Sequence, residues 1–211
     1  MLKNRVFGRS GGGQCSVLHL IKPNKIKSFY DCETLLPNDR FVLGYLGSIN
    51  SLIDIDRICE TVKKLQEYRP VEAEIIGSGE NTSKFISVLE GMNVEVHYHG
   101  PVFDEEEKYQ IFRRCHFGIN IYKEDLKIGL TAKSVDYFNY GLPVLNSIKG
   151  DTHDLVDKYG AGINIEDLDD ALTAEKVKNY KFSKYKVIEM FELLFSEDTV
   201  DKRLKFLDAL I

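Results

Sequence analysis

One segment of the sequence, from Lys127 to Ser147, brings together residue types that bind phosphate. Its Gly-Leu-Thr turn precedes an amphipathic helix with Lys133 in the first turn and Asp136 three residues later. A turn before a helix presents N–H groups without intrahelical acceptors, at the positive end of the helix dipole. Phosphate binds at such helix N-termini, where the Lys133 ammonium would add positive charge. We therefore expect this segment to hold a nucleoside diphosphate, with Asp136 accepting a hydrogen bond from a ribose hydroxyl.

Two other interpretations of this pair stay open. Lys133 would be a solvated helix lysine if no anion binds, at only a small cost beside the helix dipole. Because a spacing of three residues places side chains on neighbouring faces of a helix, Lys133 and Asp136 could also form a structural ion pair.

The composition argues against several classes of partner. The chain has 211 residues and a formal net charge of −5, a balance that does not favour nucleic acid binding. No apolar run approaches the roughly 20 residues that span a bilayer, and the N-terminus lacks a signal-peptide core. We therefore expect a cytoplasmic protein without a transmembrane segment.

From Arg40 onward, short apolar runs alternate with segments of helical periodicity. Strands are predicted at 41–46, 71–76, 94–98, 116–122, 143–146 and 162–165. Helices are predicted at 54–68, 82–91, 104–114, 132–140, 151–159, 166–177, 184–195 and 197–210. This alternation predicts an α/β fold, a doubly wound parallel six-stranded Rossmann-like sheet with C-terminal helices. Residues 1–38 are poorly patterned and are expected to form an N-terminal segment and linker, with a candidate strand at 16–21.

Small residues follow several predicted strands. Gly47, Gly77 and Gly100 all fall at the carboxyl edge of the sheet, where ligands of open α/β sheets bind. Gly47 and Ser48 are predicted to face phosphate, or simply to form a tight turn. For Gly77 and Gly79 the turn requirement is the favoured interpretation, because glycine permits such turns with or without a ligand.

The candidate metal ligands do not form a recognisable set. The four cysteines include no C-x-x-C pair, so zinc-ligand spacing is absent. His97 and His99 share one face of a predicted strand, but no third ligand is spaced to suggest a site, and ordinary packing is favoured. We expect neither a metal nor a cofactor.

Several of these motifs occur in the order known from one family. They are Gly47 after the first strand, I-I-G-S-G-E at 75–80, H-G-P-V at 99–102, G-L-P-V at 141–144 and G-D-T-H-D-L-V at 150–156. Over roughly 40–210 the chain resembles the C-terminal, donor-binding domain of GT-B glycosyltransferases of group 1. The resemblance implies a nucleotide-sugar-binding domain at 39–211. With the pattern above, it points to donor-binding residues Gly47, Ser48, Gly77, Gly100, Val102, Thr131, Lys133, Ser134 and Asp136; catalytic residues stay unassigned.

The chain also departs from the family pattern. Ser48 and Ile53 stand where the family has an Arg and a Lys on the diphosphate, and of its paired acids only Asp136 remains, because Ile128 replaces the other. Lys133 lies where a smaller bacterial branch, similar to the glucosyltransferases of streptococcal adhesin glycosylation, has a phosphate-binding lysine.

The resemblance implies a metal-independent hexosyltransferase of polysaccharide or glycoprotein assembly. It would transfer sugar from a nucleoside diphosphate sugar, with UDP favoured, to a glycan or glycoprotein acceptor. Because the family's N-terminal acceptor half has no counterpart in these residues, the expected partners include a separate acceptor-binding chain or a second copy. The alternative is a non-catalytic nucleotide-binding or regulatory partner of a complete transferase. A nicotinamide-dependent oxidoreductase is disfavoured, because the first turn reads G-S-I-N rather than G-x-G-x-x-G.

Overall fold

The computed structural model describes residues 36–124, 128–165 and 170–196, with residues 198, 199, 201 and 205. Its elements in chain order are β1 (Phe41–Leu46), α1 (Ile55–Gln66), β2 (Val71–Ile76), α2 (Thr82–Gly91), β3 (Glu95–Gly100), α3 (Glu105–Phe112), β4 (Phe117–Asn120), α4 (Ala132–Asn139), β5 (Val144–Asn146), α5 (Asp151–Tyr159), β6 (Gly162–Asn164), α6 (Asp170–Asn179) and α7 (Lys184–Phe195). These elements alternate along the chain, as the sequence predicts.

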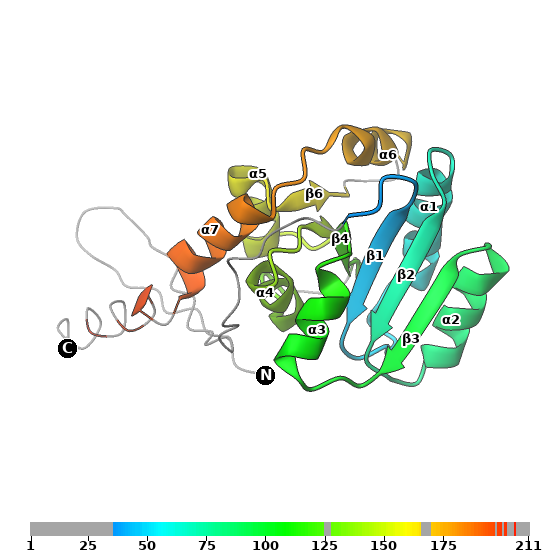
Figure 1. The fold of residues 1–211 in the computed structure, drawn as a ribbon, viewed down its shortest axis with the longest axis horizontal. Helices are drawn as coiled ribbons and strands as arrows, with labels where there is room; N and C mark the ends of the chain where they lie inside the picture. Colours follow the sequence, from blue (N-terminus) through cyan, green and yellow to red (C-terminus); the bar gives the residue numbers. More distant parts are fainter. Residues whose placement is uncertain are drawn as a thin grey trace.

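The strands form one six-stranded sheet in the order β3-β2-β1-β4-β5-β6 (Figure 1). Every neighbouring pair is parallel. The predicted doubly wound Rossmann-like sheet is therefore confirmed. The chain reverses its direction of travel across the sheet between β1 and β4, so the ligand crevice of such folds is expected at the carboxyl ends of these two strands.

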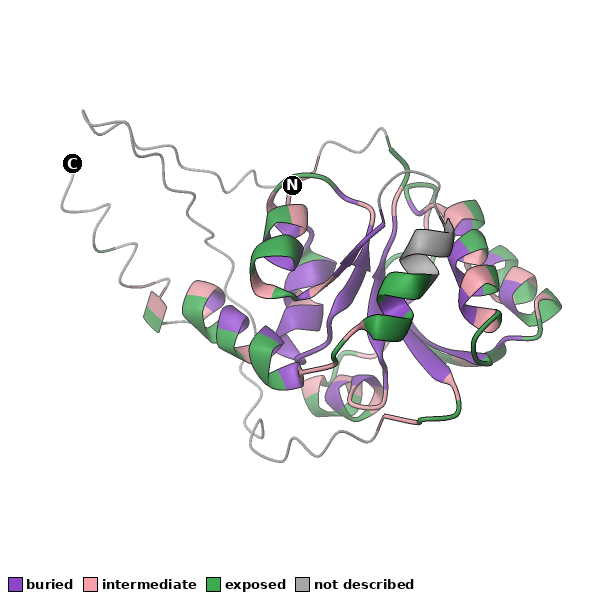
Figure 2. Ribbon diagram, turned by 90° about the horizontal axis from the view of Figure 1, so that it is seen from above, coloured by how far each residue is buried: buried purple, intermediate pink, exposed green. Residues whose placement is uncertain are grey.

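Helices cover both faces of the sheet and enclose two apolar cores. One core joins the sheet to α1, α2 and α6 through side chains such as Ile58, Phe85 and Val177. The other joins it to α3, α4, α5 and α7 through side chains such as Phe138 and Met190. Figure 2 shows the buried strands between helices whose outer faces are exposed. Burial on both faces fits the nearly continuous apolar runs of β1 and β5.

The observed bounds differ from the prediction mainly at strand ends. β3 extends to Gly100 because its pairing with β2 continues through an irregularity at Ile75–Ile76. β4 ends at Asn120, and Tyr122 instead forms an antiparallel bridge with Ile53. The predicted strand at 16–21 lies outside the described residues, as does most of the segment 1–38 and of the helix at 197–210. Across the described ranges, no helix combines the length and the apolar character needed to cross a membrane.

Candidate functional site

The carboxyl edge of the sheet is organised by glycines that end three neighbouring strands. The N–H of Gly47 donates to Ile76 O at 2.9 Å, and the N–H of Gly77 donates to Gly100 O at 2.8 Å. Gly77 has φ +129°, and a Cβ there would lie 2.0 Å from Gly47 O. Gly77 thus lets the Gly47 turn approach closely, and a Cβ on Gly79 would similarly meet Ile49 O at 2.4 Å. Packing therefore accounts for both glycines, in line with the favoured interpretation.

The start of α4 is fixed to the strand ends by hydroxyl groups. Thr131 is the N-cap: its Oγ1 accepts from the N–H of Ser134 at 3.0 Å and donates to Asn120 Oδ1 at 3.0 Å. Ser134 is fully buried, and its hydroxyl lies between those of Thr131 and Thr152. These predicted donor-binding residues hold the cap of α4, and their hydroxyls already have partners inside the fold.

A ladder of buried asparagines, which the sequence analysis missed, extends this network. Asn120 donates to Asn146 Oδ1, and Asn146 donates to Asn164 Oδ1, each at 2.8 Å. The signal was present in the sequence, since β4, β5 and β6 each end in asparagine. Through Asn120 and Thr131, the ladder ties the N-terminus of α4 to the strand ends.

The first turn of α4 keeps backbone donors available for a ligand. Thr131 caps the N–H of Ser134, and the N–H of Val135 bonds to Thr131 O. The N–H groups of Ala132 and Lys133 have no acceptor among the described residues. They lie at the positive end of the helix dipole, which favours an anion.

Lys133 extends from this turn into a setting without negative charge. The residue is only 9% exposed, and its Nζ lies 3.8 Å from the Tyr45 ring centroid and 5.0 Å from that of Tyr122. A Cβ on Gly47 would lie 3.7 Å from Lys133 Cε, so the side chain reaches the Gly47 turn. Burial lowers the pKa of Lys133 to about 7.

Neither structural interpretation of Lys133 fits this geometry. A solvated lysine would be exposed, and no carboxylate of the described residues lies within 4.0 Å of Lys133, Asp136 included. A buried ammonium is costly unless it is paired. The arrangement is a cation that lacks its anion, next to free backbone donors.

Two further predicted residues, Ser48 and Asp136, differ in how far they are buried. Ser48 is exposed, and its carbonyl accepts from the Tyr45 hydroxyl at 2.7 Å. Asp136 is half-buried; burial raises its pKa to about 6, and the charges acting on it are those of Lys108 and Glu105 on α3. Its role toward a ribose stays a prediction.

Two predicted residues lie farther along the edge, beyond β2. Gly100 ends β3 with φ +67° and open space around it, and Val102 packs half-buried against the α3–α4 side of the core. Phe103 follows with 85% exposure. The structure therefore brings Lys133 to the Gly47–Ser48 turn at the switch point, whereas Gly100 ends β3, the edge strand that β2 separates from β1.

The sequence profile of the family "Glycosyl transferases group 1" matches residues 40–180. The chain belongs to this family. The matched residues run from the strand before the Gly47 turn to the end of α6, so they include the whole edge that carries Lys133.

Solved structures of GT-B glycosyltransferases share the fold. The lipopolysaccharide outer core galactosyltransferase WaaB, in its apo form, gives a TM-score of 0.65 at 14% identity, over 92% of this chain and 56% of its own. Anabaena HepE in complex with UDP-glucose gives 0.61 at 14% identity, over 82% and 50%. The pneumococcal O-GlcNAc transferase GtfA in complex with UDP and GlcNAc gives 0.60 at 12% identity, over 88% and 38%.

Because the sequence identities are only 12–14%, these similarities show a shared fold and nothing further. This chain spans about half the length of the solved proteins or less. No curated protein sequence shows significant similarity to it.

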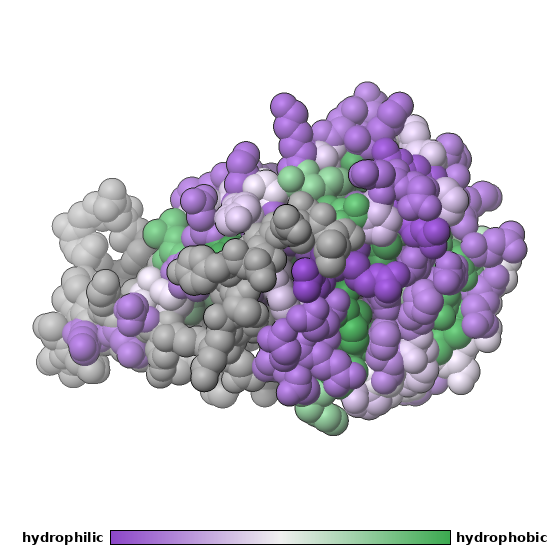
Figure 3. Space-filling view, viewed as in Figure 1, coloured by the Kyte–Doolittle hydropathy of each residue, from purple (hydrophilic) through white to green (hydrophobic). Residues whose placement is uncertain are grey.

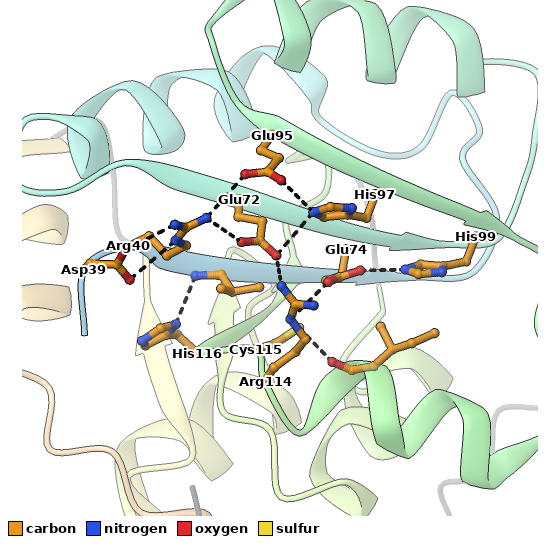
Figure 4. Close-up of polar contacts among 12 residues, drawn as sticks. Asp39, Arg40, Glu72, Glu74, Glu95, His97, His99, Arg114, Cys115 and His116 are labelled. Atoms are coloured by element: carbon orange, nitrogen blue, oxygen red, sulfur yellow. Dashed lines mark hydrogen bonds and ion pairs between the residues drawn. The ribbon is translucent and has the colours of Figure 1, made fainter. Parts of the chain in front are cut away.

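A second polar cluster of this group 1 domain lies on one face of β2 and β3 (Figure 4). Glu72 and Glu74 are each 2% exposed, beneath a layer of basic side chains. Arg114 ion-pairs with both glutamates. Arg40 Nη1 lies 3.3 Å from Glu72 Oε2, and His99 Nε2 lies 2.6 Å from Glu74 Oε2. In the space-filling view, hydrophilic side chains predominate over this part of the molecule (Figure 3).

The sequence analysis favoured ordinary packing of these histidines over a metal site, because no third ligand was spaced to suggest one; the structure gives both histidines glutamate partners that the spacing did not suggest. His97 Nε2 lies 3.4 Å from both Glu72 Oε1 and Glu95 Oε1, and these ligand atoms lie within 4.8 Å of one another. A divalent cation could use that spacing. Because Arg40 and Arg114 already supply positive charge to Glu72, we interpret the cluster as an ion-pair network.

Proposed function

We propose that this chain is the nucleotide-sugar-binding half of a group 1 glycosyltransferase. The observation that carries the proposal is the buried Lys133 ammonium without a carboxylate partner, at the sheet's switch point beside the Gly47 turn. A diphosphate would supply the missing negative charge, and the free N–H groups of Ala132 and Lys133 would donate to its oxygens.

The proposed chemistry is electrostatic. Sugar transfer leaves negative charge on the departing nucleoside diphosphate, and donors fixed where that charge develops lower the barrier. Lys133 and the first turn of α4 would perform this role without a metal. Asp136, Gly100 and Val102 are proposed to lie near the nucleoside.

The donor and acceptor are proposed from similarity. HepE and GtfA were solved with UDP, which supports a UDP-linked donor. The hexose and the glycan or glycoprotein acceptor are proposed from the family resemblance alone. The proposed relation to the adhesin-glycosylating branch rests on the position of Lys133 in the sequence. The acceptor half would come from another chain, from a second copy or from further residues of the same protein, because the solved relatives are about twice as long.

One observation favours the alternative of a non-catalytic nucleotide-binding partner. Ile53 stands where the family has a second phosphate-binding cation, and it is a core residue that bridges to Tyr122. Binding of UDP is expected under both proposals. Release of UDP from a UDP-sugar, with an acceptor half present, is expected only for the enzyme.

The binding proposal predicts that Lys133→Met weakens UDP at pH 6.5. Loss of a charged hydrogen bond is expected to cost about 1.5–3 kcal/mol, or about 10- to 150-fold in Kd. Titration calorimetry of the wild type and the variant measures this difference. Lys63→Met, an exposed lysine in the last turn of α1, is the matched control and should bind like the wild type. Equal affinity of the Lys133 variant and the wild type would remove Lys133 from the site.

A further inference from the structure

The side chains around Lys133 form a second feature of this edge, because they are aromatic and anchored. Tyr45 is fully buried, its ring packs against Phe85 at 5.3 Å, and its hydroxyl holds Ser48 O at 2.7 Å. One side chain thus lies against the ammonium and also secures the Gly47–Ser48 turn.

Tyr122 approaches the ammonium from the segment after β4. Its backbone is fixed by Ser147, whose Oγ accepts from Tyr122 N at 2.9 Å and donates to Tyr122 O at 3.1 Å. The bridge to Ile53 adds a further anchor. The Tyr122 side chain also packs against the core of the sheet. A cation over ring faces is attracted by the negative ring surface.

No described group packed against Lys133 carries a formal negative charge. From β1 the neighbour is Tyr45, from the segment after β4 it is Tyr122, and from the strand-end turn it is Gly47. The nearest acid along α4 is Asp136, which is influenced by Glu105 and Lys108 of α3. Ring faces replace only part of the hydration that burial removes, so the charged form is disfavoured until an anion arrives.

We propose that Tyr45 and Tyr122 are positioning residues for Lys133, and that binding of the donor diphosphate takes up a proton on the Lys133 amine. This inference rests on the proposed function, because it concerns the same site. The diphosphate oxygens provide the negative charge that the side chains around Lys133 lack, so the ammonium is stabilised in the complex.

The direction of the pH dependence follows from the free protein. With a pKa of about 7, Lys133 is mostly protonated at pH 6 and mostly neutral at pH 8.5. If binding raises this pKa, Lys133 takes up only a small fraction of a proton at pH 6 and close to one proton at pH 8. Affinity should fall as the pH rises above about 7, approaching tenfold per pH unit.

The test is calorimetry of UDP binding at pH 8 in two buffers of different ionisation enthalpy, where the ligand phosphate is already ionised. The dependence of the binding enthalpy on the buffer gives the number of protons taken up. We expect about 0.9 for the wild type and for Lys63→Met, and close to zero for Lys133→Met. Zero uptake by a wild type that binds UDP would overturn the proton linkage while the proposed function stood; absence of UDP binding would overturn both.

Variants of Tyr122 test the positioning role. This residue is half-buried, so its replacement disturbs the core less than replacement of the fully buried Tyr45 would. Tyr122→Leu removes the ring face, so the Lys133 amine gains water and freedom. Proton uptake at pH 8 should drop by at least half, and affinity at pH 6.5 should fall about fivefold. Tyr122→Phe keeps the ring and should restore both values. If Tyr122→Leu matches the wild type in proton uptake, the ring does not position Lys133.

Discussion

Replacing Gly77 with alanine is expected to lower the free energy of unfolding by about 3–5 kcal/mol. The backbone at Gly77 has φ +129°, which costs about 1–3 kcal/mol for a residue with a Cβ. The new Cβ would also lie 2.0 Å from Gly47 O, a contact with backbone that cannot rotate away, and such overpacking costs about 1–3 kcal/mol more. Urea unfolding followed by circular dichroism measures the change.

Gly91→Ala is the matched control for this substitution. Gly91 ends α2, and a Cβ there meets nothing within 4 Å. Alanine should raise stability by about 0.5–1 kcal/mol, because it restricts the unfolded chain and favours the helix. Unfolding of Gly77→Ala at the urea concentration of the wild type would show that the Gly47 turn does not need this close approach.

Replacing Arg114 with methionine is expected to cost about 3 kcal/mol of stability. Arg114 contacts both Glu72 and Glu74, which are almost completely buried. Removing one partner of a buried ion pair leaves an uncompensated charge and typically costs about 3–5 kcal/mol. We expect the lower end, because the Arg114 side chain is 43% exposed and Arg40 still contacts Glu72.

Lys64→Met provides the comparison for an exposed pair. Lys64 lies 3.1 Å from Glu67 on the surface of α1, where an ion pair contributes about 0–1 kcal/mol. Both variants are compared by urea unfolding at pH 7. A loss for Arg114→Met no larger than that for Lys64→Met would contradict the interpretation of the cluster as a structural network.

The sheet was predictable because the local pattern and the fold agree. The apolar runs at 41–46 and 71–76 are the observed β1 and β2, and the periodic segments at 82–91 and 184–195 are the observed α2 and α7. Strand ends were less predictable, because pairing decides them: Tyr122 leaves β4 to bridge with Ile53.

The position of Lys133 at the ligand edge was predictable, but its environment was not. A residue in the first turn of a helix is exposed or buried according to its neighbours, and Tyr45 and Tyr122 come from distant segments of the chain. The polar face of β2 had a signal, since Glu72 and Glu74 alternate with apolar residues. That alternation places both glutamates on one face, although their basic partners come from other elements.

The most direct measurement of the central claim is a map of backbone amide shifts in the ¹⁵N-labelled protein as UDP is added. The account predicts the largest changes at Gly47, Ser48, Ala132 and Lys133, where the diphosphate is proposed to lie between the strand-end turn and the start of α4. Changes centred on β6 and α6, or no saturable change at all, would contradict it.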